Sequence, residues 1–150
     1  EKIEIAKKYG CDEVINYSKE DFAKKVLELT NGKGVSVVYD GVGKTTYDKS
    51  IECLKLRGTM VSFGNASGPL DPIIVSKSLQ PKGIYFVRPA MNQYFTNSEE
   101  IQEAANMLFK QISSGNIKIE IFKKYKLKDA VQAHKDLEGR KITGPAVIIP

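Results

Sequence analysis

The sequence predicts an α/β protein built on a parallel sheet. Short apolar runs end abruptly in glycine-rich or polar segments, as at residues 35–43 and 58–68, and amphipathic helical segments separate these runs. The runs are apolar nearly throughout, as is typical of parallel strands that are covered on both faces. Ligands of such sheets bind just beyond the carboxyl ends of the strands. We therefore expect a ligand near Phe63 and Gly64, where the run that starts at Thr59 stops.

The composition indicates a folded, soluble chain. It has 150 residues, of which 41% are apolar and 27% charged, and no apolar run approaches the length that spans a bilayer. The net charge is +5, without a block of like charges, and the densest basic patch is Lys123, Lys124, Lys126 and Lys128. A solvated face is the favoured interpretation of this patch, and a nucleic-acid footprint is the alternative.

Few residues of this chain could bind a metal. Cys11, Cys53 and His134 do not have the spacing of a zinc site, so we expect none within the chain. Both thiols are expected to pack as small apolar groups in a reducing compartment, which favours the cytosol. The chain opens at Glu1 within a helical pattern that Gly10 ends, and we interpret it as a fragment that begins partway through a fold.

The first half of the chain alternates strands and helices. After the opening helix we predict strands at 13–17, 35–40 and 59–63. Ser18 is expected to cap the first intervening helix, with Asp21 answering the cap and Phe22, Val26 and Leu29 facing inward. The second helix has Tyr47, Ile51 and Leu54 at helical spacing and is expected to continue to Gly58. Connections of this kind produce a parallel sheet.

The second half is less regular. Prolines interrupt residues 69–81, a strand is predicted at 84–87, and residues 90–96 resemble a linker. A helix should begin at Asn97 and Glu100 and bury Ile101, Ala105, Leu108 and Ile112. Alternating isoleucines predict a half-buried strand at 117–121, and a helix at 129–137 and a strand at 146–149 follow.

Five motifs, in order, carry a family resemblance: INYSKEDF, TNGKGVSVVYDGVG, SFGNASG, FVRP and AHKDLEGRKITGPAVIIP. Together they closely resemble the zinc-independent quinone oxidoreductases, the zeta-crystallin-like branch of the medium-chain dehydrogenases. The resemblance implies a partial Rossmann-type, NADPH-binding domain at 1–95 that lacks its first βα unit and its glycine-rich phosphate loop. It implies that residues 96–150 are the C-terminal segment of a GroES-like catalytic domain.

The resemblance also implies cofactor-binding residues. Lys2 and Tyr17 match positions that hold the 2′-phosphate of NADPH, and a cation there suits a phosphate. Val42 and Gly43 match a loop at the adenosine side, Phe63 and Gly64 a loop near the nicotinamide. The remaining matches are Phe86, Val87 and Arg88 beside the carboxamide, and Arg140 toward a phosphate. An exposed lysine or arginine, core aromatics and turn-forming glycines are the alternative interpretations of these positions.

The implied activity is hydride transfer from NADPH to a quinone without zinc, with the fragment alone inactive. No catalytic acid or base is nominated, and His134 is interpreted as structural. The alternatives are an enone or enoyl thioester reductase, or a non-catalytic nucleotide-binding, RNA-binding or structural role. The resemblance further implies a homodimer through the strand at 84–88, while RNA is possible but not favoured.

Overall fold

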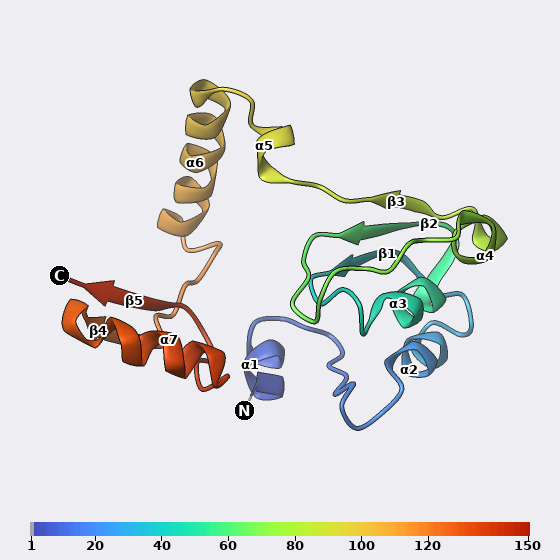
Figure 1. Ribbon diagram of the computed structural model, residues 1–150, viewed down its shortest axis with the longest axis horizontal. Helices are drawn as coiled ribbons and strands as arrows, with labels where there is room; N and C mark the ends of the chain where they lie inside the picture. The colour runs from blue at the N-terminus through green and yellow to red at the C-terminus, as the bar shows by residue number, and fades with distance from the viewer. Residues whose placement is uncertain (1) are drawn as a thin grey trace. The chain divides into compact units, whose positions relative to one another are not determined.

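The computed structural model describes residues 2–150, which form two compact units, residues 3–94 and 95–150 (Figure 1). The assignment of residues 1–95 to a cofactor-binding domain and of 96–150 to a catalytic domain stays a prediction. No helix among residues 2–150 combines the length and the apolar character needed to cross a bilayer.

A three-stranded parallel sheet organises the first unit (Figure 1). Its order is β1 (Val35–Asp40), β2 (Leu54–Ser62) and β3 (Tyr85–Val87), with both pairs parallel. α3 (Tyr47–Cys53) connects β1 to β2, and α4 (Val75–Ser78) and η1 (Gln80–Lys82) precede β3. The predicted α/β class with a parallel sheet is therefore confirmed. The core consists of Ile51, Leu54, Met60 and Ile84.

Two helices precede the sheet. The predicted opening helix is α1 (Lys2–Lys8), and the next is α2 (Phe22–Leu29). The cap of α2 is Asp21 rather than Ser18, because Asp21 Oδ1 accepts hydrogen bonds from Ala23 N at 3.0 Å and Lys24 N at 3.2 Å. Ser18 precedes this N-cap by three residues and lies in a turn, outside the position from which a side chain caps a helix. The expected inward face is wrong at its last position, since Leu29 is exposed.

The second predicted helix is too long by one turn. α3 ends at Cys53, and Leu54 instead begins β2, where it pairs with Val35. Lys82 Nζ donates hydrogen bonds to the carbonyls of Glu52 at 2.8 Å and Leu54 at 2.7 Å, so it satisfies acceptors at the end of the helix. Helical spacing of apolar residues could not reveal this stop, because Lys82 comes from a segment 28 residues further along.

The predicted strand at 13–17 is absent: these residues are irregular. A strand needs a neighbour whose backbone groups it can pair with, and among residues 2–150 β1 pairs only with β2. The expectation that β1 is covered on both faces is also wrong for this chain. Val37 and Tyr39, on one face of β1, are 42% and 74% exposed.

The predicted linker contains one short helix, α5 (Met91–Tyr94). The helix predicted next is α6 (Ser98–Ser113), and its cap is confirmed, because Asn97 Oδ1 accepts from Glu100 N at 2.9 Å. Its expected inward face is wrong at Ile101 and Leu108, which are exposed, whereas Ala105 and Ile112 are half-buried.

The second unit pairs β4 (Lys123–Lys126) with β5 (Ala146–Ile149) in parallel, beside η2 (Leu127–Asp129) and α7 (Ala130–Glu138). The helix at 129–137 and the strand at 146–149 are thus confirmed. The strand at 117–121 is wrong, because the strand that pairs with β5 begins at Lys123 and the alternating isoleucines remain exposed.

Three lysines of the basic patch, Lys123, Lys124 and Lys126, lie in β4, and Lys128 lies in η2. In β4, Tyr125 is buried and donates its hydroxyl to Asp136 Oδ2 at 2.8 Å, while Lys123 Nζ lies 3.3 Å from the same oxygen. These contacts give Lys123 a structural partner, and RNA binding by this strand stays an untested prediction.

Candidate functional site

Two loops at the carboxyl ends of β1 and β2 are bonded to each other over most of their length. We call residues 41–46 and 63–68 the paired loops. Phe63 N donates to Asp40 O at 2.9 Å, and Ser67 N donates to Val42 O at 2.7 Å. Further bonds run from Ala66 N to Gly41 O, Lys44 N to Gly68 O, Thr45 N to Ser67 Oγ, and Ser67 Oγ to Val42 O. The paired loops therefore form one platform at the edge where ligands of parallel sheets bind.

Glycines let the paired loops approach this closely. A Cβ on Gly64 would lie 2.7 Å from Gly41 Cα, closer than real Cβ atoms come to another carbon. Gly43 has a φ of +90°, and a Cβ there would lie 2.8 Å from Gly68 O. Both positions thus require glycine, the first for space and the second also for its backbone conformation.

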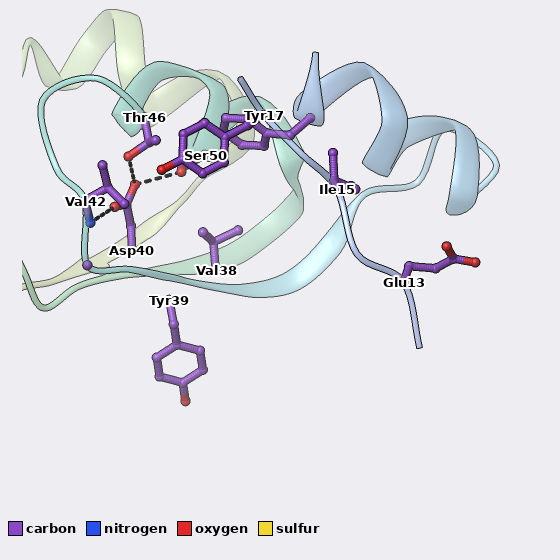
Figure 2. Close-up of a pocket in the computed structure, with 11 residues that line it drawn as sticks. Glu13, Ile15, Tyr17, Val38, Tyr39, Asp40, Val42, Thr46 and Ser50 are labelled. Carbon is purple, nitrogen blue, oxygen red and sulfur yellow. Dashed lines mark hydrogen bonds between the residues drawn. The ribbon is translucent and has the colours of Figure 1, made fainter. Parts of the chain in front are cut away.

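Asp40, the last residue of β1, is buried with only 5% of its surface exposed. Its Oδ1 accepts from Val42 N at 2.8 Å, and its Oδ2 accepts from the hydroxyls of Thr46 and Ser50, each at 2.8 Å (Figure 2). Oδ1 also accepts from Gly43 N at 2.9 Å. Burial raises the pKa of the Asp40 carboxyl, but these hydrogen bonds outweigh it and hold the pKa below its usual value. Asp40 is therefore a charged acceptor at neutral pH.

A cavity of about 290 Å³ lies beside Asp40, on the side of β1 that faces residues 13–17. Figure 2 shows Val38 and Asp40 on one side of β1 and Tyr39 on the other. The cavity is lined by Glu13, Ile15, Tyr17, Phe22, Val38, Tyr39, Asp40, Gly41, Val42, Thr46 and Ser50. Its volume is at the lower end for ligand pockets, about 300–1,000 Å³, and its walls combine aromatic rings with loop backbone.

Arg88, just after β3, holds the second of the paired loops. Its Nη1 donates to Ser62 O at 2.9 Å, Ser62 Oγ at 3.2 Å and Gly64 O at 3.1 Å. The guanidinium thereby satisfies carbonyl groups at the end of β2 and fixes the backbone at Gly64. In this structure Arg88 acts on the loop that the resemblance places near the nicotinamide.

The structure brings six of the ten predicted site residues to the carboxyl edge of the sheet: Val42, Gly43, Phe63, Gly64, Val87 and Arg88. Phe86 packs against the core, with its ring 6.3 Å from that of Tyr47. Tyr17 lines the cavity edge-on to Phe22, with ring centroids 6.2 Å apart.

The remaining two predicted residues are Lys2 and Arg140. Lys2 is exposed at the start of α1. Arg140 belongs to the second unit, just beyond α7, and has the uncommon positive φ of 55°. A bulky residue adopts this conformation only where its surroundings enforce it. Cofactor binding by any of the ten residues stays a prediction.

Sequence reasoning missed the residues that hold the platform together, namely Asp40, Thr46, Ser50 and Ser67. Asp40 carried a usable signal, because it is a lone acidic residue at the end of an apolar strand and directly before Gly41. Ser50 and Ser67 carried none, since ordinary helix and loop positions often hold serine. Their partners are 10 and 25 residues distant in the chain.

The cysteines differ in their surroundings. Cys53 is buried, as expected, and burial together with the nearby Glu52 carboxylate raises the pKa of its thiol to about 11. Cys11 is exposed, so the expectation that both thiols are packed is wrong for Cys11. Residues 2–150 bring together no group of three or more His, Cys, Asp or Glu side chains that could hold a metal ion.

Comparisons with known proteins give concordant results. The family described as zinc-binding dehydrogenase matches residues 9–148. A 2-haloacrylate reductase from a Burkholderia species is 44% identical over all of this chain, which covers 45% of that protein. Quinone oxidoreductase 1 of Escherichia coli is also 44% identical, with all of this chain and 46% of that protein covered. The chain thus spans just under half the length of these relatives.

Solved structures resemble the chain along its whole length. The Escherichia coli quinone oxidoreductase complexed with NADPH has a TM-score of 0.91 at 44% identity, over 99% of this chain and 46% of its own. A mycobacterial structure, also complexed with NADPH, has a TM-score of 0.90 at 41% identity, over 99% of this chain and 47% of its own.

Proposed function

Since this chain belongs to the zinc-binding dehydrogenase family, we propose that the intact protein is an NADPH-dependent quinone reductase of which this chain is the C-terminal part. The observation that carries the proposal is the platform of paired loops at the carboxyl edge of a parallel sheet, which is the ligand-binding edge of such sheets. The identity of 44% to a quinone oxidoreductase supports the substrate class.

The residues present suit a dinucleotide. Gly43 and Gly64 allow the two loops to pack backbone against backbone, which places loop backbone at the edge where a dinucleotide would bind. Bound nicotinamide would supply the hydride, and this chain would bind and orient it. Under the proposal, residues 1–95 belong to the cofactor-binding domain and residues 96–150 to the catalytic domain. Lys2 and Tyr17 would then hold the 2′-phosphate, and Arg140 another phosphate.

The zinc in the family's description does not fit this chain. A zinc site takes three or four ligands from Cys, His and carboxylate side chains, and residues 2–150 bring no such group together. The proposed activity therefore assigns zinc no role among these residues.

The test is turnover by the intact protein. We expect oxidation of NADPH, followed by its absorbance, to depend on added quinone and to be faster than oxidation of NADH. Titration with each coenzyme, followed by nicotinamide fluorescence, separates binding from turnover. A folded protein that binds neither coenzyme and oxidises neither with any quinone would refute the proposal.

Reduction of an activated alkene is a second candidate. The 2-haloacrylate reductase is as similar to this chain as the quinone oxidoreductase is, at 44% identity. The same assay with 2-haloacrylate or an enoyl thioester in place of the quinone distinguishes the candidates. An alkene reductase would oxidise NADPH when the alkene is added and not when the quinone is added.

We also propose a homodimer joined through β3. Among residues 2–150, β3 pairs on one side only, and Tyr85 is 65% exposed. An unpaired edge of this kind can extend a sheet into a second copy. Sedimentation should show a dimer that Tyr85→Asp weakens, whereas Tyr94→Asp, at another exposed tyrosine, should not. A monomeric wild-type protein would contradict the proposal.

A cytosolic location is the remaining proposal. The exposed free thiol of Cys11 suits a reducing compartment, and cell fractionation would test it.

A further inference from the structure

We propose that Asp40 is the positioning residue of the cofactor platform: its carboxylate fixes the backbone of Val42 and Gly43 and, through them, the orientation of both paired loops. The inference deepens the proposed function and rests on it. Each carboxylate oxygen of Asp40 already accepts two hydrogen bonds from the chain, so we expect Asp40 to act through the loop rather than on the cofactor itself.

One carboxylate oxygen of Asp40 binds the loop and the other binds the start of α3 (Figure 2). Oδ1 takes the consecutive N–H groups of Val42 and Gly43, at 2.8 and 2.9 Å, and so holds the turn in which Gly43 has a φ of +90°. Oδ2 takes the hydroxyls of Thr46 and Ser50. These residues are four apart, and that spacing places them on one face where α3 begins. One side chain thus connects the strand end, the loop and the helix.

The side chain of Thr46 is directed toward Asp40 and not toward its own helix. Thr46 is the N-cap of α3, a position where threonine normally accepts a hydrogen bond from its own helix, yet its side chain makes no such bond. Its hydroxyl lies against the carboxylate and donates to Asp40 Oδ2 at 2.8 Å. The Thr46 side chain therefore connects the start of α3 to Asp40 rather than capping the first turn of the helix.

The constraint extends from the first loop to the second. With the Val42 and Gly43 amides held by Asp40, the carbonyls of Gly41 and Val42 accept from Ala66 N at 3.3 Å and Ser67 N at 2.7 Å. Loss of the carboxylate would leave the buried N–H of Gly43 and the partly buried N–H of Val42 without this acceptor and release this register. The loop predicted to approach the nicotinamide would then lose part of its support and depend more on Arg88, although Asp40 is 23 residues before Phe63 in the chain.

Three variants of the intact protein test the role. Asp40→Ala removes the acceptor. Asp40→Asn keeps an oxygen that can accept from the two N–H groups, and its amide NH₂ can donate to the hydroxyl oxygens of Thr46 and Ser50. Thr46→Val removes one hydroxyl at nearly constant shape, and it keeps the proposal testable if Asp40→Ala does not fold. The matched control is Asp21→Ala, since Asp21 also accepts two consecutive backbone N–H groups, at the start of α2, while its contact with α3 is an ion pair with the partly exposed Lys49 side chain and involves no residue of the paired loops.

Two readouts are required. The first is amide hydrogen exchange at residues 41–46 and 63–68 in cofactor-free protein, and the second is the Kd for NADPH from nicotinamide fluorescence. We expect Asp40→Ala to exchange faster in both loops and to raise the Kd about tenfold or more. Thr46→Val should also speed exchange and raise the Kd, but by less. Asp40→Asn should have exchange rates and a Kd close to those of wild type. Asp21→Ala should lower thermal stability but leave the loops and the Kd unchanged.

If amide hydrogen exchange in the paired loops is unchanged in Asp40→Ala, the proposal is overturned. If Asp40→Ala does not fold, unchanged exchange in Thr46→Val overturns it. Faster exchange with an unchanged Kd would also overturn it, because the loops would then be held without consequence for binding. If wild-type protein binds no NADPH, the proposed function fails, and the exchange comparison alone decides whether Asp40 holds the two loops.

Discussion

Replacing Gly64 with alanine should disrupt the paired loops more than any other single added methyl group. Its Cβ would collide with the Gly41 backbone, 2.7 Å from Cα, and backbone held by Asp40 and β1 cannot move aside. We expect destabilisation at or above the upper end of the about 1–3 kcal/mol typical of overpacking, measured by urea unfolding. NADPH binding should be lost even where the variant remains folded.

Gly41→Ala provides a matched comparison at the same contact. Its Cβ would meet the Phe63 ring, 3.0 Å from Cζ, and a side chain can rotate away. The loss of stability should therefore be smaller than for Gly64→Ala. Gly144→Ala is the neutral control, because its nearest neighbour would be Phe122 Cβ at 3.4 Å. Equal stability of Gly64→Ala and Gly144→Ala would show that the loops separate without cost.

Replacing Lys2 with alanine should reduce the preference for NADPH over NADH. If the Lys2 ammonium binds the 2′-phosphate, its removal loses a charge-assisted hydrogen bond of about 1.5–3 kcal/mol. That corresponds to a rise of roughly 10-fold to 150-fold in the Kd for NADPH. The Kd for NADH, which has a free hydroxyl at this position, should remain unchanged. Parallel fluorescence titrations of the intact protein measure both constants.

Lys7→Ala is the matched control for Lys2. Lys7 is another exposed lysine of α1, so its loss changes the net charge equally and leaves the proposed phosphate contact in place. Salt should weaken NADPH binding in the control as it does in wild type. A Lys2→Ala variant with an unaltered coenzyme preference would remove Lys2 from the proposed site and leave Tyr17 to be tested in the same way.

Local signals in the sequence were sufficient for most elements of this chain. The cap of α6 at Asn97, the strand β1 and the stop of α1 near Gly10 each depend on neighbouring residues, and each was predicted correctly. The errors arose where a distant segment decided the outcome. α3 ends early because Leu54 pairs with Val35 and its carbonyl accepts from Lys82. β5 pairs with residues 123–126, although residues 117–121 have the clearer alternation of apolar and polar residues.

The candidate site divides in the same way. The glycines and apolar strand ends that mark the carboxyl edge of the sheet were visible as composition, because a loop that approaches another backbone closely needs glycine at particular positions. The bonds that join the paired loops were not. Ser67 meets Val42 across 25 residues, and Arg88 meets Ser62 across 26.

By itself, therefore, the sequence determined the α/β class, the parallel sheet and the edge at which a ligand is expected, since periodicity and turn composition are local properties of the chain. Only the tertiary structure decided that Asp40 is the centre of the platform. A buried carboxylate is stable only when the fold surrounds it with donors. The positions of Thr46 and Ser50 around Asp40 exist only after β1, its loop and α3 have packed together.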